Sequence, residues 1–139
     1  MQSLRKKLKE KKGFTLIEMI IVIAIIAILI ALIAPNLQKF LNTAKQTKVD
    51  AAAKTLYTSA STYLVDMYAQ GTPVDTKSKT WTQSSIPQDF LKDYFNQNEI
   101  KEGVTYEIIF DDEGNILKTE WHEDNLDGIY PKGATKDTP

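Results

Sequence analysis

The sequence contains no cysteine and only one histidine, and both shortages narrow the chemistry that the protein can perform. Without cysteine it forms no disulfide framework and no thiolate metal site, although this does not identify a cellular compartment. A Ser-His-Asp triad would have to use His122, whose neighbours in the sequence form no nucleophile motif. We therefore expect that the protein is not an enzyme and needs no catalytic cofactor.

Charge is missing from one long stretch of the chain. From Met19 to Ala34 no side chain is charged or polar. A helix from Phe14 to Ala34 would be about 30 Å long, which matches the hydrocarbon thickness of a bilayer. Up to Gly13 the chain has six basic residues and one acidic residue, which give this segment a net charge of +5. Because the net charge of the whole chain is −1, the residues after Gly13 carry −6. This asymmetry predicts a single membrane pass with the N-terminus in the cytoplasm.

Glu18 is the one ionised residue beside this apolar run. Without a partner, a carboxylate in lipid costs about 3 kcal/mol or more. A secretory signal peptide is one interpretation, but the alanines of the run form no A-x-A cleavage site and the run is long for such a peptide. A plain single-pass anchor also fits, with Glu18 either unexplained or solvated at the level of the headgroups.

The residues around Glu18 favour a third interpretation. Lys11-Lys12-Gly13 is followed by Phe14-Thr15-Leu16-Ile17-Glu18 and by an apolar run that ends at Pro35. This arrangement resembles the class III signal of type IV pilins and pseudopilins. The resemblance implies that a membrane-embedded prepilin peptidase recognises Lys11 and Lys12, cleaves after Gly13 and methylates the new amine of Phe14.

Cleavage at Gly13 would explain the carboxylate. It would create an α-amine on Phe14, four residues before Glu18. In a staggered helical array the amine of an incoming subunit meets the Glu18 carboxylate of a packed one, so the pair sets the register of assembly. Alanines at three- and four-residue spacing in the run would let such helices approach closely.

The rest of the chain predicts an α+β fold, with a long helix packed on a small antiparallel sheet as in type IV pilins. We expect a leader (1–13), a transmembrane or filament-core helix (14–35), an amphipathic half of the same helix (36–70), a connecting loop with a short helix (71–100) and a head with a tail (101–139). Pro35 should kink or locally melt the helix, because it has no amide hydrogen and disfavours helix at Ala34. Gly71-Thr72-Pro73 should end it.

The amphipathic half is predicted to dock on the head through apolar residues spaced three or four apart. These are Leu37, Leu41, Ala44, Ala52, Leu56, Ala60, Tyr63 and Met67. The opposite side carries Lys39, Lys45, Asp50, Lys54 and Ser61.

Within the head, two strands at Val104–Phe110 and Ile116–His122 form a hairpin, with Gly114 or Asn115 at positive φ. A third strand is a guess near Gly128–Tyr130. Thr72–Ser85 is expected to be a loop. Pro87–Phe95 is expected to be a short helix capped by Ser84 or Ser85, with Phe90, Leu91, Tyr94 and Phe95 on its buried side.

Acidic residues give the head its charge. Asp75 to Asp137 contains 14 carboxylates and 7 lysines, which disfavours direct nucleic-acid binding through the head. Asp124, Asn125 and Asp127, followed by glycine, are candidate calcium ligands of a kind found in some pseudopilins, although a solvated acidic loop is the default. The spacing is not that of an EF-hand.

The resemblance implies a major or minor pilin that is held in the cytoplasmic membrane and then packed into a cell-surface filament. Its implied partners are copies of itself, the prepilin peptidase, and an assembly platform with a separate ATPase. One alternative is a pseudopilin of a DNA-uptake or type II secretion system, which shares the same N-terminus. Another is a membrane-anchored extracellular domain that does not polymerise.

Overall fold

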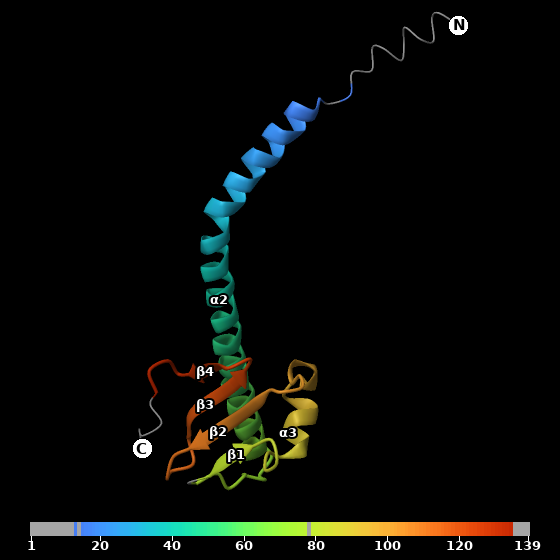
Figure 1. Cartoon of the computed structure of the whole chain (residues 1–139). Coiled ribbons are helices and arrows are strands. Elements are labelled where there is room, and N and C mark those ends of the chain that lie inside the picture. The colour runs from blue at the N-terminus through green and yellow to red at the C-terminus, as the bar shows by residue number, and fades with distance from the viewer. Residues whose placement is uncertain (1–12, 14, 78, 135–139) are drawn as a thin grey trace, which may run out of the picture. The chain divides into compact units, whose positions relative to one another are not determined.

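The fold was analysed in a computed structural model that describes residues 13, 15–77 and 79–134. In chain order the elements are α2 (Leu16–Ala69), β1 (Thr80–Thr82), α3 (Gln88–Asp93), the 3₁₀-helix η1 (Gln97–Glu99), β2 (Thr105–Phe110), β3 (Ile116–Glu123) and β4 (Leu126–Tyr130) (Figure 1). The expected α+β class is confirmed. The chain divides into two compact units between Leu41 and Asn42.

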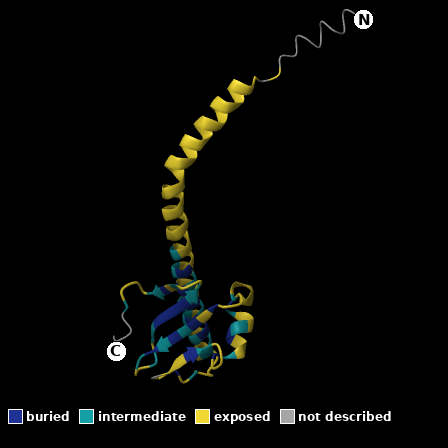
Figure 2. Cartoon of the chain, in the orientation of Figure 1, coloured by how far each residue is buried: buried dark blue, intermediate teal, exposed yellow. Residues whose placement is uncertain are grey.

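The first unit contains the apolar part of α2. Every described residue from Thr15 to Lys45 is exposed (Figure 2). The most apolar stretch of α2 has a mean hydropathy of 3.3, and it makes α2 the one described helix that is long and apolar enough to cross a membrane. A helix that is apolar on all sides needs lipid or other protein around it. The isolated subunit supplies neither to this stretch.

Pro35 lies inside α2, and the helix continues through it without interruption. The local melting that was offered as one outcome is therefore wrong for this structure, whereas the kink stays a prediction. A proline in a helix removes the donor for the carbonyl four residues earlier, here that of Ala31. One residue further along, the Asn36 side chain donates to the Leu32 carbonyl at 3.5 Å, next to the carbonyl that lacks its helical donor.

The end of α2 confirms the expected stop at Gly71. Gly71 has a φ of +76°, and its amide donates to the Tyr68 carbonyl at 3.1 Å. The Thr72 amide donates to the Met67 carbonyl at 3.0 Å. These two bonds form a Schellman motif, in which glycine adopts the left-handed conformation without steric cost.

In the second unit a four-stranded antiparallel sheet packs against the C-terminal part of α2 (Figure 1). The strands follow chain order β1-β2-β3-β4, so each neighbour is the next strand in sequence. The buried core draws Val49, Ala53, Leu56, Ala60 and Tyr63 from α2, and Trp81, Ile86, Phe90, Phe95, Val104, Tyr106, Ile108, Phe110 and Trp121 from the rest of the unit.

The docked face of α2 is shorter than predicted. Leu56, Ala60 and Tyr63 are buried as expected, but Leu37, Leu41 and Ala44 are exposed. The buried positions that the prediction missed are Val49 and Ala53. Apolar spacing alone therefore located the right helix and misplaced the first residue that the sheet covers.

The sheet has more strands than expected. The hairpin of β2 and β3 is confirmed, with Gly114 at a φ of +93°. The guessed third strand is real and begins earlier, at Leu126. The prediction of a loop over Thr72–Ser85 is wrong in one place, because Thr80–Thr82 forms β1 beside β2.

The short helix α3 is confirmed, but its predicted cap is wrong. Pro87 occupies the N-cap position and makes no side-chain cap bond. The Ser85 hydroxyl instead accepts from the Thr82 amide at 2.9 Å and closes the turn that precedes the helix. Phe90 and Phe95 are buried and Leu91 and Tyr94 half-buried, as predicted for this face.

Candidate processing and assembly site

The predicted processing site lies where the described residues begin. Gly13 is exposed, and a Cβ added to it would meet no atom within 4 Å. Lys11, Lys12 and Phe14 lie outside the described residues. The cleavage and methylation assigned to these positions therefore stay predictions.

Glu18 forms a reciprocal pair of bonds with Thr15 at the start of α2. Its carboxylate Oε2 accepts from the Thr15 amide at 3.2 Å, and the Thr15 hydroxyl accepts from the Glu18 amide at 3.3 Å. This is a capping box, which satisfies donors that the first helical turn leaves free. A Thr-x-x-Glu sequence before an apolar run is its signal, and the sequence analysis did not use it.

The capping box places a negative charge at the positive end of the helix macrodipole. Such placement is worth about 0.3–1 kcal/mol at an exposed position. The carboxylate is thus stabilised by its own subunit before any other subunit arrives. A role in register requires a second subunit to offer more than the Thr15 amide does.

The calcium candidates do not form a loop. Asp124 (φ 52°) and Asn125 (φ 61°) are the two turn residues between the paired residues Glu123 and Leu126. Two successive positive φ angles define a type I′ hairpin turn, which Asx residues favour. Asp127 lies in β4. The described residues include no group of three or more acidic or histidine side chains arranged to hold a metal ion, so calcium binding stays a prediction.

Gly128, which the sequence analysis placed after the calcium candidates, has another use. A Cβ at this position would lie 2.0 Å from the Val49 carbonyl oxygen of α2. Real Cβ atoms do not approach a carbonyl so closely, so only glycine lets β4 cross the helix backbone here. No signal in the sequence distinguishes this glycine from one in a turn.

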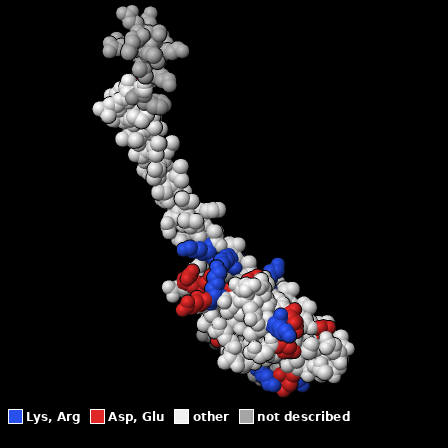
Figure 3. Space-filling model, turned by 90° about the vertical axis from the view of Figure 1, so that its right-hand side faces the viewer, with Lys and Arg blue, Asp and Glu red and all other residues white. Residues whose placement is uncertain are grey.

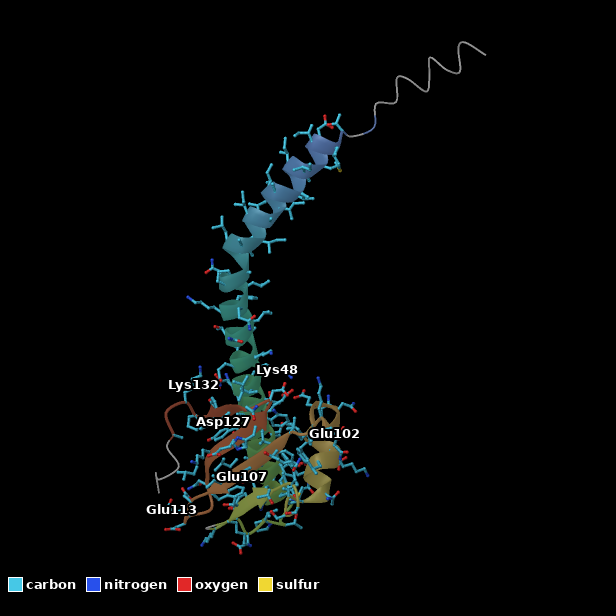
Figure 4. All side chains as sticks on the ribbon, viewed as in Figure 1. Lys48, Glu102, Glu107, Glu113, Asp127 and Lys132 are labelled. Carbon is cyan, nitrogen blue, oxygen red and sulfur yellow. The ribbon has the colours of Figure 1, made fainter. Side chains whose placement is uncertain are left out.

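Polar contacts beside this crossing tie the β3–β4 hairpin to α2. The Lys48 ammonium lies 2.5 Å from the Glu123 carboxylate, and the side-chain amide of Gln46 donates to the backbone carbonyl of Asp127 at 2.8 Å. The Lys48 ammonium holds the pKa of Glu123 below its ordinary value. Figure 4 shows Lys48 on α2 and Asp127 on the adjacent strand.

The one histidine lies between carboxylates on the sheet. His122 Nδ1 is 2.6 Å from Asp127 Oδ1, and its Nε2 is 3.5 Å from Glu120 Oε2. Glu120 also binds Lys118 at 3.1 Å, and both of these side chains are buried. The histidine therefore joins β3 to β4 in a row of charged groups that the sequence analysis did not foresee.

Two tyrosine–aspartate bonds join α2 to α3. The Tyr63 hydroxyl donates to Asp89 at 2.9 Å, and the Tyr94 hydroxyl donates to Asp66. Burial and the bond to Asp89 raise the pKa of Tyr63 to about 12. The bond to Asp66 and burial raise the pKa of Tyr94 to about 12.

Comparison with known proteins bears directly on the N-terminal segment. Residues 8–34 match the family model described as the prokaryotic N-terminal methylation motif. The major fimbrial protein FimA of Dichelobacter nodosus is 32% identical over 114 residues, which cover 78% of this chain and 70% of that protein. A fimbrial protein of Pseudomonas aeruginosa is 31% identical over 106 residues, or 73% of this chain and 68% of that protein.

A third relative matches a shorter segment. The type IV major pilin PilA of Myxococcus xanthus is 46% identical over 52 residues, which are 37% of this chain and 24% of that protein. No solved structure matches the chain significantly. The extent of the FimA and Pseudomonas matches, together with the methylation motif and the helix-on-sheet fold, shows that the chain belongs to the type IV pilin family.

Proposed function

We propose that the protein is a structural subunit of a type IV pilus, cleaved after Gly13, N-methylated at Phe14 and then polymerised. The observation that carries this proposal is the exposed apolar run of α2, which lies within the match to the methylation motif and has no cover in the subunit. Before assembly the run would span the cytoplasmic membrane, with the N-terminus inside. In the filament at the cell surface, neighbouring helices would cover it.

The proposed partners follow from this sequence of events. A prepilin peptidase would process the leader, and an assembly platform with its ATPase would extract the subunit from the membrane. The other members of the filament would be copies of the same chain. These partners are inferred from membership of the family, because the relatives bear pilin or fimbrial names.

Glu18 would change partners during assembly. In the free subunit it accepts a bond from the Thr15 amide. Phe14 directly precedes Thr15, so the amine made by cleavage would lie one residue from that amide. The Glu18 carboxylate already makes a charge-assisted bond to this neutral amide, but the amine carries a full positive charge and adds the Coulomb attraction of an ion pair. The carboxylate would therefore leave its own cap for the amine of a neighbour.

A pair of variants separates this role from helix capping. Glu18→Ala removes both the capping bond and the charge, whereas Thr15→Ala weakens the capping box and keeps the charge. We expect both to be cleaved after Gly13, with filaments formed by Thr15→Ala and lost in Glu18→Ala. Intact-mass measurement reports processing, and electron microscopy of the native host reports filaments. Equal loss of filaments in both variants would reduce Glu18 to a capping residue.

A second candidate is a pseudopilin of a DNA-uptake or type II secretion system. The N-terminal motif serves both classes, but five of the relatives, FimA and PilA among them, are named as major subunits of a fimbria or pilus. Long, abundant surface filaments would support the pilus, and short periplasmic ones the pseudopilus. A mature protein that keeps its leader would instead support a membrane anchor without polymerisation.

A further inference from the structure

After Ala34, the described residues expose large apolar side chains at two places only. The first is Leu37, Phe40 and Leu41, with exposed fractions of 49%, 68% and 45%. The second is Val65 and Tyr68, with exposed fractions of 69% and 77%. The second place lies in the second compact unit, which we call the head from here on and in which other large apolar side chains are wholly or partly covered by the fold.

Val65 and Tyr68 border a groove between the last turns of α2 and the turn that joins β2 to β3. They are three residues apart on the helix, so their side chains lie on the same face. The groove is lined by Tyr57, Ser61, Leu64, Val65, Tyr68, Gly114, Asn115 and Ile116. Apolar side chains therefore come from both the helix and the start of β3, and they form a patch that a partner could cover.

An acidic turn lies at one end of this groove. The β2–β3 turn that supplies Gly114 and Asn115 to the groove also contains Asp111, Asp112 and Glu113, which line a separate hollow beside Phe110 and Leu117. The Asp111 carboxylate accepts from the Glu113 and Asn115 amides at 2.9 and 2.8 Å, which fixes the shape of the turn. Figure 4 shows Glu113 at this turn, with its side chain directed away from the sheet.

The other exposed set has the opposite charge. Leu37, Phe40 and Leu41 flank Lys39, and Lys45 follows six residues later. No charged residue precedes Lys39 in α2 after Glu18, and Figure 3 shows basic side chains just after this uncharged stretch. The segment 37–41 is thus an apolar surface with a basic border, and it continues the run that we assign to the filament core.

We propose that the groove around Val65 and Tyr68 receives segment 37–41 of a second copy of this chain, with Lys39 beside the acidic β2–β3 turn. The inference rests on the proposed filament and adds to it a contact between the head and the helix of two subunits. Apolar surface meets apolar surface, and the borders have complementary charge. Because the two surfaces differ, each subunit offers both, and the contact propagates into an open array instead of closing as a dimer.

The absence of cysteine makes this contact directly testable. Phe40→Cys and Tyr68→Cys both change exposed side chains, so neither should disturb the fold. The double variant would be assembled in the native host, and sheared filaments would be treated with a short bismaleimide. We expect a ladder of covalent dimers, trimers and higher species. Either single variant alone should stay monomeric, and filaments that mix the two single variants should give dimers only.

A matched control replaces one of the two positions. Thr105 is exposed at the end of β2 away from the β2–β3 turn. Phe40→Cys combined with Thr105→Cys should give no ladder. If the Phe40→Cys/Tyr68→Cys variant does not assemble alone, it can be incorporated as a minority into filaments of the unmodified subunit. Covalent dimers after the same reaction would then show the contact, and their absence would contradict it.

Three results would overturn the inference. Filaments of the double variant without cross-linked species would show that the two segments do not meet. Strong cross-linking of Tyr68→Cys alone would show that the groove pairs with itself. Equal ladders from the Thr105→Cys control would show that segment 37–41 has no preference for the groove over the far end of β2. All three results are compatible with the proposed role as a filament subunit. That role would be contradicted if the unmodified chain formed no filaments.

A charge exchange provides an independent arm. Glu113→Lys should lower the yield of surface filaments, because it places a lysine opposite Lys39. Lys39→Glu in the same chain should restore the yield. Loss without restoration would remove the charged border from the proposal.

Discussion

The two parts of α2 bury their apolar surface in different ways. From Thr15 to Lys45 every described residue is exposed, whereas five residues between Val49 and Tyr63 are fully covered by the sheet and α3. The second part has one apolar face and one polar face, and its partner is in the same chain. The first part is apolar on all sides, so its partner must be outside the chain. One helix thus contributes separately to folding and to assembly.

Truncation of the covered face should give the largest loss of stability. Leu56 is fully buried, so Leu56→Ala should lower the free energy of unfolding by about 2–5 kcal/mol. Ile28 is 61% exposed, so Ile28→Ala should change it little in the detergent-solubilised subunit. Denaturant unfolding followed by the fluorescence of Trp81 and Trp121 measures both. Equal losses would mean that the two parts of the helix are not distinct.

A smaller loss should follow from a methyl group where β4 crosses α2. Gly128→Ala places a Cβ against the Val49 carbonyl, and such overpacking costs about 1–3 kcal/mol. The same unfolding experiment measures the effect. Thr105→Ala, at an exposed strand position, is the control. A Gly128→Ala subunit as stable as the control would contradict the close approach.

Alkaline pH should loosen the contact between α2 and α3. The folded pKa values of Tyr63 and Tyr94, about 12, exceed the ordinary value of 10.0. A raised pKa means that the protonated hydroxyl is favoured in the folded state, so this stability is complete below pH 10 and is lost as pH rises toward 12. Unfolding measured across that range should show the decline. A Tyr63→Phe/Tyr94→Phe variant should show a weaker pH dependence, and an unchanged one would exclude these two bonds as its cause.

The smallest effect concerns the start of the first part. Thr15→Ala removes the hydroxyl of the capping box and should weaken the first turn by about 1 kcal/mol. Hydrogen exchange of amides near Glu18 in detergent should become faster, while exchange in the head stays the same. Faster exchange in the head as well would show that the two parts of the chain unfold together.

The sequence predicted those features that local patterns encode. The apolar run, the helix stop at Gly71 and the β2–β3 hairpin follow from hydropathy, glycine and strand alternation, and the structure confirms them. The strand β1 was missed because only three residues form it, and Trp81 is the one apolar side chain among them. A strand this short exists through its partner β2, which no local pattern reveals.

Errors at the site have the same origin. Gly128 was taken as part of a possible calcium loop, although its use is a contact with Val49, 79 positions earlier in the chain. Leu37 and Leu41 have the spacing of a docked face, but the sheet begins to cover α2 only near Val49. Periodicity shows which side of a helix is apolar. It does not show whether its own chain or another copy covers that side.

Electron cryomicroscopy of filaments from the native host tests the central claim most directly. We predict a mature chain that begins at Phe14, with the apolar run of α2 buried among the same run of neighbouring subunits and the sheet still packed on the second part of the helix. Filaments in which this run faces solvent or lipid, or a processed chain that never leaves the membrane, would contradict it.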